Sequence, residues 1–499
     1  MTLAEAKAKL EEYQRVSLAL GHAAGVISYD GNTVAPKQSA KIRAVTQSEL
    51  GRIEYELTTS NETEEMILTL REHRAELDEV TARISDELYR DFDRTRRIPK
   101  DLYVEYEKLC VESDDIWHSA KANDDFASFE PTLSKMFDMT KQIALCVEPD
   151  KDPYDTQLDM FERGLDTKTC DRFFATLKAG IVPLIEKVTA SPYQIDEPLL
   201  RGNFPIPVQR DFSTYLMKLI GIDPERCIIG ETEHPFTDGT TKYDVRITTH
   251  YHEDNVLSSM YSVIHEGGHA LYELGISDEL TMGLLGTGVS MGIHESQSRF
   301  YENIIGRSRE FCGLILPWLK EHFPAQLGGL TEERLYRAVN ASSPSLIRTE
   351  ADELTYCLHV MIRYELERKM FKGDLTAKEL PAAWNEMYKE YLGIDVPNDR
   401  EGVLQDSHWS FGGIGYFPSY AIGSAYGAQF LEEMNKSFDV FEAVSKGEIR
   451  KISEWLKDRI WQYGCLFEPS DLFRRICGEL RPEVFVNYLS RKYTELYRL

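Results

Sequence analysis

Apolar residues three and four positions apart recur along most of this 499-residue chain, with Glu, Lys and Arg between them. This spacing places apolar side chains on one face of an α-helix. The segments with the clearest pattern are 3–20, 40–57, 62–92, 102–122, 168–189, 346–371 and 482–496. The pattern therefore predicts a mainly helical protein.

Strict alternation of apolar and polar residues, which is typical of a half-buried strand, is rare in the chain. The best case is segment 242–250, where Tyr243, Val245 and Ile247 alternate with polar residues. Segment 227–229 is a second, shorter candidate. We therefore expect a small sheet.

Segment 256–275 has the apolar pattern of a buried helix and follows the strand directly. Asp254 and Asn255 are candidate N-caps, and Gly275 is a candidate C′ residue. A strand beside such a helix commonly holds an extended peptide by β-addition, so segment 242–250 is a candidate substrate-binding strand.

The buried helix contains His265-Glu266-Gly267-Gly268-His269, an H-E-x-x-H motif. Residues i and i+4 lie on one helix face, so both imidazoles would reach one zinc ion. Zinc lowers the pKa of a water molecule from about 15.7 to near 7, and the neighbouring Glu266 carboxylate would take its proton. The motif also occurs by chance, but charged and polar groups are rare in a buried helix without a use. The two glycines indicate close packing or substrate approach.

A catalytic zinc site needs a third protein ligand. Gly275 stands six residues after His269, where one known class of zinc peptidase has a third His, so that class is excluded. Glu295 is the preferred ligand because it lies near the start of a following helix and faces the intervening loop. Glu302 is its main rival, whereas Glu273 is too close to His269 on the same helix.

Composition narrows the possible partners and location. The formal net charge is -26, which disfavours binding to nucleic acid or to an anionic membrane. We find no run of 18 apolar residues and no signal-peptide core at the N-terminus, and the eight cysteines are scattered without a C-x-x-C motif. We therefore expect a cytoplasmic protein with reduced thiols and no membrane segment.

The highly charged stretch 62–97 permits two interpretations. It would bind a charged partner, or it would be the solvated face of exposed helices, which is the commoner case. With no internal repeat and no low-complexity linker, the chain predicts one domain over 1–499. Its N-terminal helices, about 1–125, would form a lid over a zinc-site core of about 230–430.

Six short motifs, in this order, are shared with one known family. They are His234-Pro235-Phe236, Asp244-Val245-Arg246-Ile247-Thr248, His265-Glu266-Gly267-Gly268-His269, His294-Glu295-Ser296-Gln297, Ile347-Arg348-Thr349-Glu350-Ala351-Asp352 and Gly402-Val403-Leu404-Gln405-Asp406-Ser407-His408-Trp409. On these motifs the chain resembles the carboxypeptidase Taq family of metallocarboxypeptidases.

The resemblance implies a mainly α, neurolysin-like fold with a deep central groove and a small β-sheet beside the active-site helix. It implies zinc, or cobalt as a substitute, bound by His265, His269 and Glu295, with Glu266 as general base and acid. The expected activity is removal of single C-terminal residues from peptides with a free C-terminus, with broad specificity. A homodimer is also expected.

A carboxypeptidase must recognise the terminal carboxylate of its substrate, and a guanidinium pairs bidentately with a carboxylate. Arg348 resembles this clamp in the family's motif; the alternative is an ion pair with Asp352 one helical turn on. Arg246 is either another carboxylate contact or a structural partner of Asp244.

Three further residues are candidates for contact with the peptide. His408 and Tyr420 are candidate donors to the oxyanion, because related zinc peptidases place a His and a Tyr at a similar separation. Tyr420 would equally belong to a core aromatic loop. His234 is a candidate donor to the substrate backbone.

Two other functions remain open. A peptidase on the same scaffold would cut internally, as an oligopeptidase or dipeptidase, and would be indifferent to a free C-terminus. A non-catalytic peptide-binding protein would keep the groove, but Glu266 and the complete ligand set argue against it. An aminopeptidase is disfavoured because no G-x-M-E-N element is present.

Overall fold

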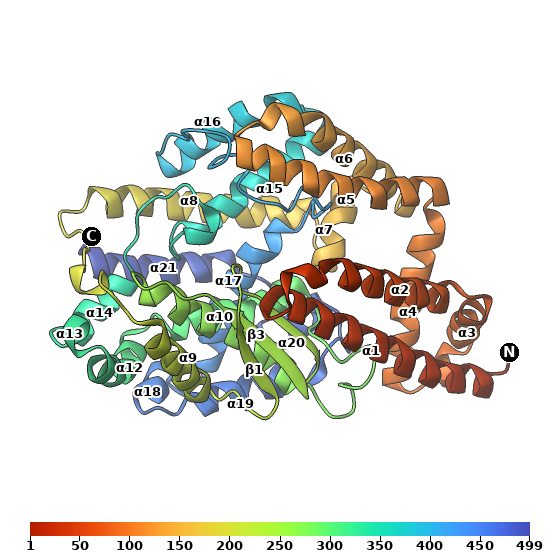
Figure 1. Ribbon diagram of the computed structural model, residues 1–499, viewed down its shortest axis with the longest axis horizontal. Helices are drawn as coiled ribbons and strands as arrows, with labels where there is room; N and C mark the ends of the chain where they lie inside the picture. Colours follow the sequence, from red (N-terminus) through yellow and green to blue (C-terminus); the bar gives the residue numbers. More distant parts are fainter.

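The computed structural model describes all residues from 1 to 499, and most of them lie in helices (Figure 1). The bounds of the helices are α1 (Leu3–Thr33), α2 (Ala40–Thr59), α3 (Asn61–Glu72), α4 (Glu79–Arg97), α5 (Lys100–Asn123), α6 (Phe126–Val147), α7 (Pro153–Phe161), α8 (Thr167–Ala190), α9 (Ile206–Ile220), α10 (Val256–Gly275), α11 (Met291–Arg299), α12 (Arg309–His322), α13 (Pro324–Leu327), α14 (Glu332–Val339), α15 (Tyr356–Lys372), α16 (Leu380–Leu392), α17 (Phe417–Met434), α18 (Val440–Ser445), α19 (Ile449–Arg459), α20 (Pro469–Cys477) and α21 (Pro482–Tyr497). The predicted mainly α fold with a small sheet is confirmed.

The sheet has three strands, β1 (Cys227–Glu231), β2 (Thr237–Thr241) and β3 (Asp244–Thr249), in the order β1-β3-β2. β3 pairs in parallel with β1 and antiparallel with β2, and both β2 and β3 pack on α10. Because β3 is hydrogen-bonded on both sides, it has no free edge for a peptide. Our choice of segment 242–250 as the substrate-binding strand is therefore wrong; the free edges belong to β1 and β2.

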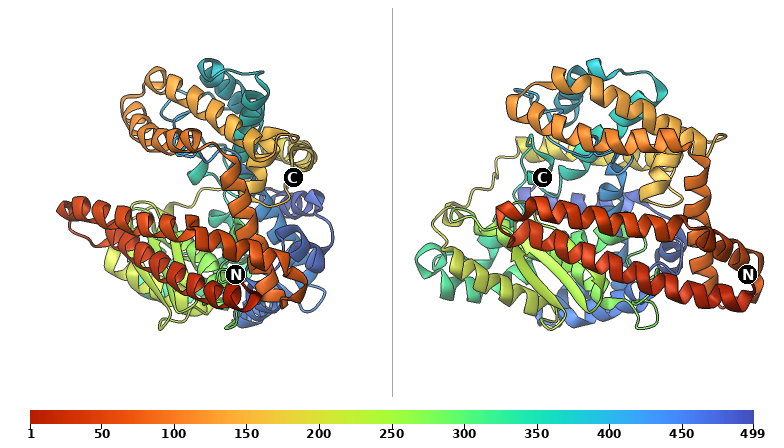
Figure 2. Two further views of the ribbon diagram at one scale, coloured as in Figure 1. Left: turned by 90° about the vertical axis from the view of Figure 1, so that its right-hand side faces the viewer. Right: turned by 45° about the vertical axis from the view of Figure 1, so that its right-hand side comes forward.

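Two groups of helices spread away from a common base (Figure 2). α1 and α2 form an antiparallel pair beside β2, and α5 pairs with α6 on the opposite side. Along the chain α3 and α4 connect the two groups, and α4 runs between them.

Buried apolar side chains form two separate cores. The larger draws its members from Leu109 to Tyr497 and surrounds α10, α15 and α17. The smaller joins α1, α3 and α4 to the segment 276–285, which follows α10. The N-terminal helices are therefore attached to the rest of the molecule through their own apolar contacts.

Several predicted elements agree closely with the structure, including α8, α21 and β3, but three predicted helices do not. The helix predicted over 3–20 continues to Thr33 as α1. The helix predicted over 62–92 is broken, because Asp78 caps a new helix by accepting from the backbone N–H of Thr81. The helix predicted over 346–371 begins only at Tyr356. Asp352 accepts from the backbone N–H groups of Leu354 and Thr355 and so holds a turn before it.

No helix combines the length and the apolar character needed to cross a membrane. All eight cysteines are free.

Candidate metal centre

α10 supplies the first two candidate ligands, His265 and His269. The side chain of Asn255 caps the helix by accepting from the backbone N–H of Ser258, as predicted. The prediction for Gly275 is wrong: it is the last helical residue, not a left-handed C′. A Cβ atom at Gly275 would lie 2.6 Å from the Trp461 ring, so close packing accounts for this glycine.

α11 supplies the third candidate ligand and crosses α10 at very short range. A Cβ atom at Gly268 would lie 2.6 Å from the carbonyl oxygen of Gln297 and 2.7 Å from the Cα atom of Ser298. Only glycine permits this approach of two backbones. The crossing brings Glu295 of α11 opposite the two histidines of α10.

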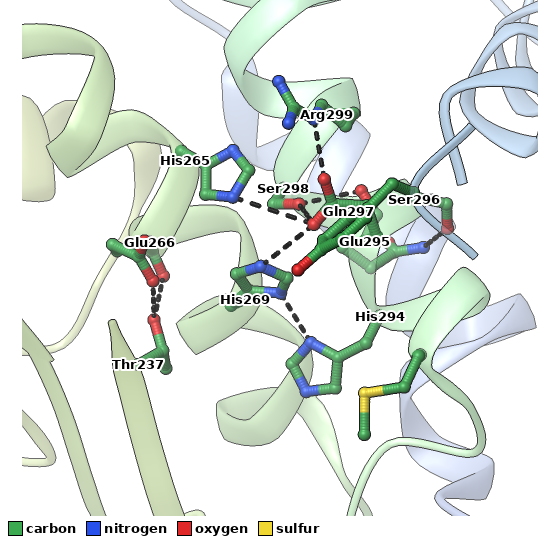
Figure 3. Close-up of polar contacts among 12 residues, drawn as sticks. Thr237, His265, Glu266, His269, His294, Glu295, Ser296, Gln297, Ser298 and Arg299 are labelled. Carbon is green, nitrogen blue, oxygen red and sulfur yellow. Dashed lines mark hydrogen bonds and ion pairs between the residues drawn. The ribbon is translucent and has the colours of Figure 1, made fainter. Parts of the chain in front are cut away.

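One ligand atom from each of His265, His269 and Glu295 lies within 4.8 Å of the other two (Figure 3). The Glu295 Oε2 atom is 3.7 Å from His265 Nε2 and 3.5 Å from His269 Nε2. Four ligands at about 2.0–2.2 Å around a tetrahedral ion are about 3.4 Å apart, so the spacing fits a metal of zinc's size.

The other ring nitrogen of His265 contacts Glu302, which lies in a π-helical segment, Phe300–Ile305. His265 Nδ1 is 2.8 Å from Glu302 Oε2 and donates to it, because an ionised carboxylate can only accept. The Nε2 lone pair of His265 is then left facing Glu295. Glu302 is therefore the partner of a candidate ligand and does not belong to the three-ligand group.

The second ring nitrogen of His269 contacts another histidine. His294 Nε2 is 2.8 Å from Glu273 Oε1 and donates to it, which leaves His294 Nδ1 as an acceptor. His269 Nδ1, 2.6 Å away, therefore donates to His294, and its Nε2 lone pair faces Glu295. Burial lowers the pKa of His269 to about 3, so its imidazole is neutral. The neutral His269 imidazole, the Nε2 atom of His265 and the Glu295 carboxylate together form a donor set that fits a divalent cation.

Glu266 is buried beside this group. Thr237 of β2 donates to Glu266 Oε2 at 2.6 Å, which leaves Oε1 without a protein partner. Burial is the largest cause that raises the pKa of Glu266, against the opposing effects of His265 and Thr237. Its carboxylate is thus a stronger base than one in water.

Arg348 is buried and does not pair with Asp352. Its Nε and Nη2 atoms lie 3.0 and 2.9 Å from Asp406, and its Nη1 donates to the Tyr356 hydroxyl at 3.0 Å. Arg363 shares the same carboxylate at 2.6 Å. One N–H on each terminal nitrogen of Arg348 is left over from these contacts.

His408 and Tyr420 lie together beside Arg348, with His408 Nε2 3.1 Å from the Tyr420 hydroxyl. The Arg348 guanidinium is 4.9 Å from the centre of the Tyr420 ring. Burial, followed by the charge of Arg348, lowers the pKa of His408 to about 3. Burial is also the main cause that raises the pKa of Tyr420, and the charge of Glu295 adds to it. A neutral imidazole and a phenol are therefore present near the candidate ligands.

The two remaining candidates lie on strand β3 and in the loop that connects β1 to β2. Arg246 donates twice to Asp244, at 2.8 Å each, so the structure pairs it with Asp244. His234 lies in the loop that connects β1 to β2, on a cavity of about 680 Å³ that α1 also lines. Thr237, which contacts Glu266, lines the same cavity.

Sequence reasoning missed the residues that position the candidate ligands and Arg348. His294 stands beside Glu295 and Asp406 stands two residues before His408, each within one of the six motifs, and that closeness was the available signal. Glu273 was considered only as a ligand and rejected on spacing. Thr237 lies in a strand without apolar alternation, so nothing in the sequence pointed to it.

Known proteins are similar to this chain over nearly its whole length. The family model of the carboxypeptidase Taq (M32) metallopeptidase matches residues 9–493. Carboxypeptidase 1 of Bacillus subtilis is 38% identical, with 96% of each chain covered. Thermostable carboxypeptidase 1 of Thermus thermophilus is 36% identical, with 100% of each chain covered.

A solved structure has the same fold. An M32 carboxypeptidase from Deinococcus radiodurans R1 is 34% identical and aligns with a TM-score of 0.96 over 99% of this chain and 100% of that one. Sequence and fold thus agree along nearly the full length of the chain. The chain belongs to the carboxypeptidase Taq (M32) family of metallopeptidases, and it is a metallocarboxypeptidase.

Proposed function

We propose that this enzyme releases single C-terminal amino acids from peptides with broad side-chain specificity, using a zinc ion held by His265, His269 and Glu295. The observation that carries the proposal is the set of three lone pairs directed at one point, with both histidines held in the required tautomer. The donor set of two imidazoles and one carboxylate is typical of catalytic zinc, and cobalt would substitute for it.

A zinc ion in this site would polarise the last peptide carbonyl and make a water molecule more acidic. Glu266 accepts the proton of that water on Oε1, the oxygen that Thr237 does not contact. It then passes the proton to the nitrogen of the leaving amino acid. The support for this role is the raised pKa of Glu266 and its position beside His265.

Arg348 binds the terminal carboxylate of the peptide in this proposal. The two N–H groups left over from its contacts with Asp406 and Tyr356 form the fork that a carboxylate accepts. Asp406 and Tyr356 hold the guanidinium in one orientation before the peptide binds. The clamp explains why such an enzyme would act at the C-terminus.

Tyr420 donates to the oxyanion, His408 acts on the same oxyanion by positioning the Tyr420 hydroxyl, and His234 donates to the peptide backbone. If His408 Nε2 donates to the Tyr420 oxygen, the phenol proton stays free for the oxyanion. The support for His234 is its place on the same cavity as Thr237.

Mass spectrometry of a matched peptide pair tests the proposal. One peptide has a free C-terminus and the other is amidated, and both are incubated with the zinc-loaded enzyme. We expect stepwise loss of C-terminal residues from the free peptide alone. Internal cleavage of both peptides would instead make the enzyme an oligopeptidase or dipeptidase.

The variant Arg348→Lys extends this test to the clamp. Lysine keeps the charge but lacks the planar fork. Because a hydrogen bond to a charged group contributes about 1.5–3 kcal/mol, we expect kcat/KM for the free peptide to fall by about 10–100-fold. An unchanged kcat/KM would remove Arg348 from the proposal.

The proposal also includes a cytoplasmic homodimer in which each chain forms one catalytic domain. The helices of residues 1–125 would be a lid over the groove. The eight free cysteines support a reducing compartment. The apolar core that α1, α3 and α4 form with segment 276–285, separate from the main core, supports treating these helices as a unit of their own. Sedimentation equilibrium should give a mass twice that of one chain, and a monomer mass would contradict the dimer.

A further inference from the structure

The charged stretch 62–97 lines a cavity of about 590 Å³ away from the candidate metal centre. Its walls come from the end of α3, from α4 and α7, and from the connection between α6 and α7. Eight cationic and six anionic side chains line this basic pocket, and only Tyr89 and Val147 are hydrophobic. The excess of positive charge stands against a formal net charge of -26 for the chain.

Arg90 and Arg94 of α4 are the least neutralised cations in the basic pocket. They lie one helical turn apart on the same face and share the single carboxylate of Asp159, at 3.7 and 3.5 Å. Asp159 also accepts from the backbone N–H of Gly164 at 2.9 Å. One partly occupied carboxylate therefore serves two guanidinium groups, both less than one-third exposed.

A second pair of arginines in the basic pocket, Arg71 and Arg74, also shares one carboxylate. Asp86 alone accepts from Arg71 at 2.6 Å and from Arg74 at 2.6–3.0 Å. Arg83 and Arg163, by contrast, are matched one for one by Glu87 and Glu468. Two arginine pairs that face one cavity, Arg90 with Arg94 and Arg71 with Arg74, thus each have a single carboxylate.

We propose that the basic pocket binds an anion with several linked phosphate groups. Guanidinium groups bind phosphate bidentately, and two separate arginine pairs would engage more than one phosphate. The cavity has the volume of a small-molecule site and offers almost no apolar surface for a base or sugar. Recognition therefore rests on the phosphates, which a nucleoside triphosphate and inorganic tripolyphosphate share.

Isothermal titration calorimetry of the metal-loaded, full-length enzyme tests this site, with sodium tripolyphosphate as the probe in about 0.1 M salt. We expect binding tighter than about 1 mM, weakened at least tenfold in Arg90→Gln/Arg94→Gln. The control is Arg52→Gln on α2, because neither Arg52 nor its partners Glu49 and Glu56 line the cavity. The control should bind as the unmodified enzyme does.

The other arms of the titration identify what is recognised. ATP should bind within about threefold of tripolyphosphate, and orthophosphate should bind at least tenfold more weakly. A much tighter ATP complex would overturn recognition by phosphate alone, and equal binding of orthophosphate would overturn the requirement for linked phosphates. Undiminished binding in the double variant would place the anion elsewhere, including on the metal, and would overturn the site.

Folding of the double variant is checked by its peptidase activity, which should be unchanged because neither arginine is near the candidate metal centre. If that variant does not fold, Arg94→Lys replaces it. Lysine keeps the charge but not the fork, so tripolyphosphate should bind several-fold more weakly. Equal affinity in that variant would overturn recognition by the guanidinium groups.

Discussion

At the scale of single residues, the metal-binding nitrogen of His269 is determined by groups that do not face the site. Glu273 determines the tautomer of His294, and His294 determines that of His269. Glu302 determines the tautomer of His265 directly, by accepting from its Nδ1. The pattern H-E-x-x-H places two imidazoles on one helix face, but these carboxylates orient the rings.

Replacement of His294 by Phe should weaken metal binding by about 10–100-fold, because His269 loses the acceptor that orients its ring. A phenyl ring keeps most of the packing against Tyr272, so the fold should persist. Competition with a zinc-binding dye measures the affinity. His322→Phe is the control, since His322 stacks on Trp318 at another place. Equal affinity in both variants would show that His294 does not orient His269.

Replacement of Glu266 by Gln should leave metal content unchanged and lower kcat by about 10²–10⁴-fold. The amide oxygen of Gln still accepts from Thr237, so the local structure is kept while the base is lost. Metal analysis of the purified variant and a peptidase assay give the two readings. Full activity would contradict the role of Glu266 as general base.

At the scale of elements, the site depends on the crossing of α10 and α11. α17 continues this packing on the far side of α11, where a Cβ at Gly423 would lie 2.9 Å from the Cβ of Glu295. Three helices are thus in contact at glycines, and the positions of the ligands follow from how closely these helices approach.

Gly267 and Gly268 provide a matched test of this crossing. A Cβ at Gly268 would strike the backbone of α11, whereas one at Gly267 would meet the Cδ1 atom of Ile220, 2.5 Å away, which can rotate. Gly268→Ala should therefore lower the free energy of unfolding by about 1–3 kcal/mol or more. Gly267→Ala should be close to neutral, because its gain in helix propensity of about 1 kcal/mol offsets the contact.

Thermal unfolding and metal content of the two variants provide the measurement. A lower unfolding temperature together with a lower metal content in Gly268→Ala, but not in Gly267→Ala, would support a crossing limited by backbone contact. Equal stability of the two variants would contradict it.

At the scale of the whole molecule, Glu367 of α15 joins segments that are far apart in the chain. Its buried carboxyl accepts from the Tyr154 hydroxyl of α7 at 2.7 Å, from the Trp409 indole at 2.6 Å and from the backbone N–H of Gly415 at 2.9 Å. The last two residues flank the loop next to His408. Burial raises the pKa of Glu367 to about 7, despite these three donors.

This shift predicts a pH dependence of stability. A carboxyl whose pKa is raised from 4.5 to about 7 on folding keeps its proton in the folded state, so its contribution is most favourable below pH 4.5. That contribution is lost as pH rises through 7, by an amount on the order of 3 kcal/mol. Glu367→Gln removes the titration, so the difference in unfolding free energy between wild type and variant should fall between pH 5 and pH 8.

Urea denaturation of both proteins at several pH values measures that difference. Because other groups titrate in both proteins, only the difference reports Glu367. A difference that is constant with pH would contradict the shifted pKa of Glu367.

Much of the fold and part of the site follow from the sequence alone. The 3.6-residue period is a local property, so most of the helices, including α8 and α21, could be predicted from it. The spacing of His265 and His269 is equally local. Glu295 was preferred over Glu302 on its place at a helix start, and α11 does begin just before it at Met291.

The tertiary structure alone decided what depends on distant contacts. The turn at Asp352, the central position of β3 and the pairing of Arg348 with Asp406 leave no periodic trace in the sequence, because each arises from hydrogen bonds outside the local pattern. The basic pocket likewise exists only where α4 meets α7. The sequence by itself determined the helices and the chemistry of the ligands. Packing between helices determined how the ligand side chains are oriented, because that orientation depends on which helix surfaces approach closely enough to exclude water.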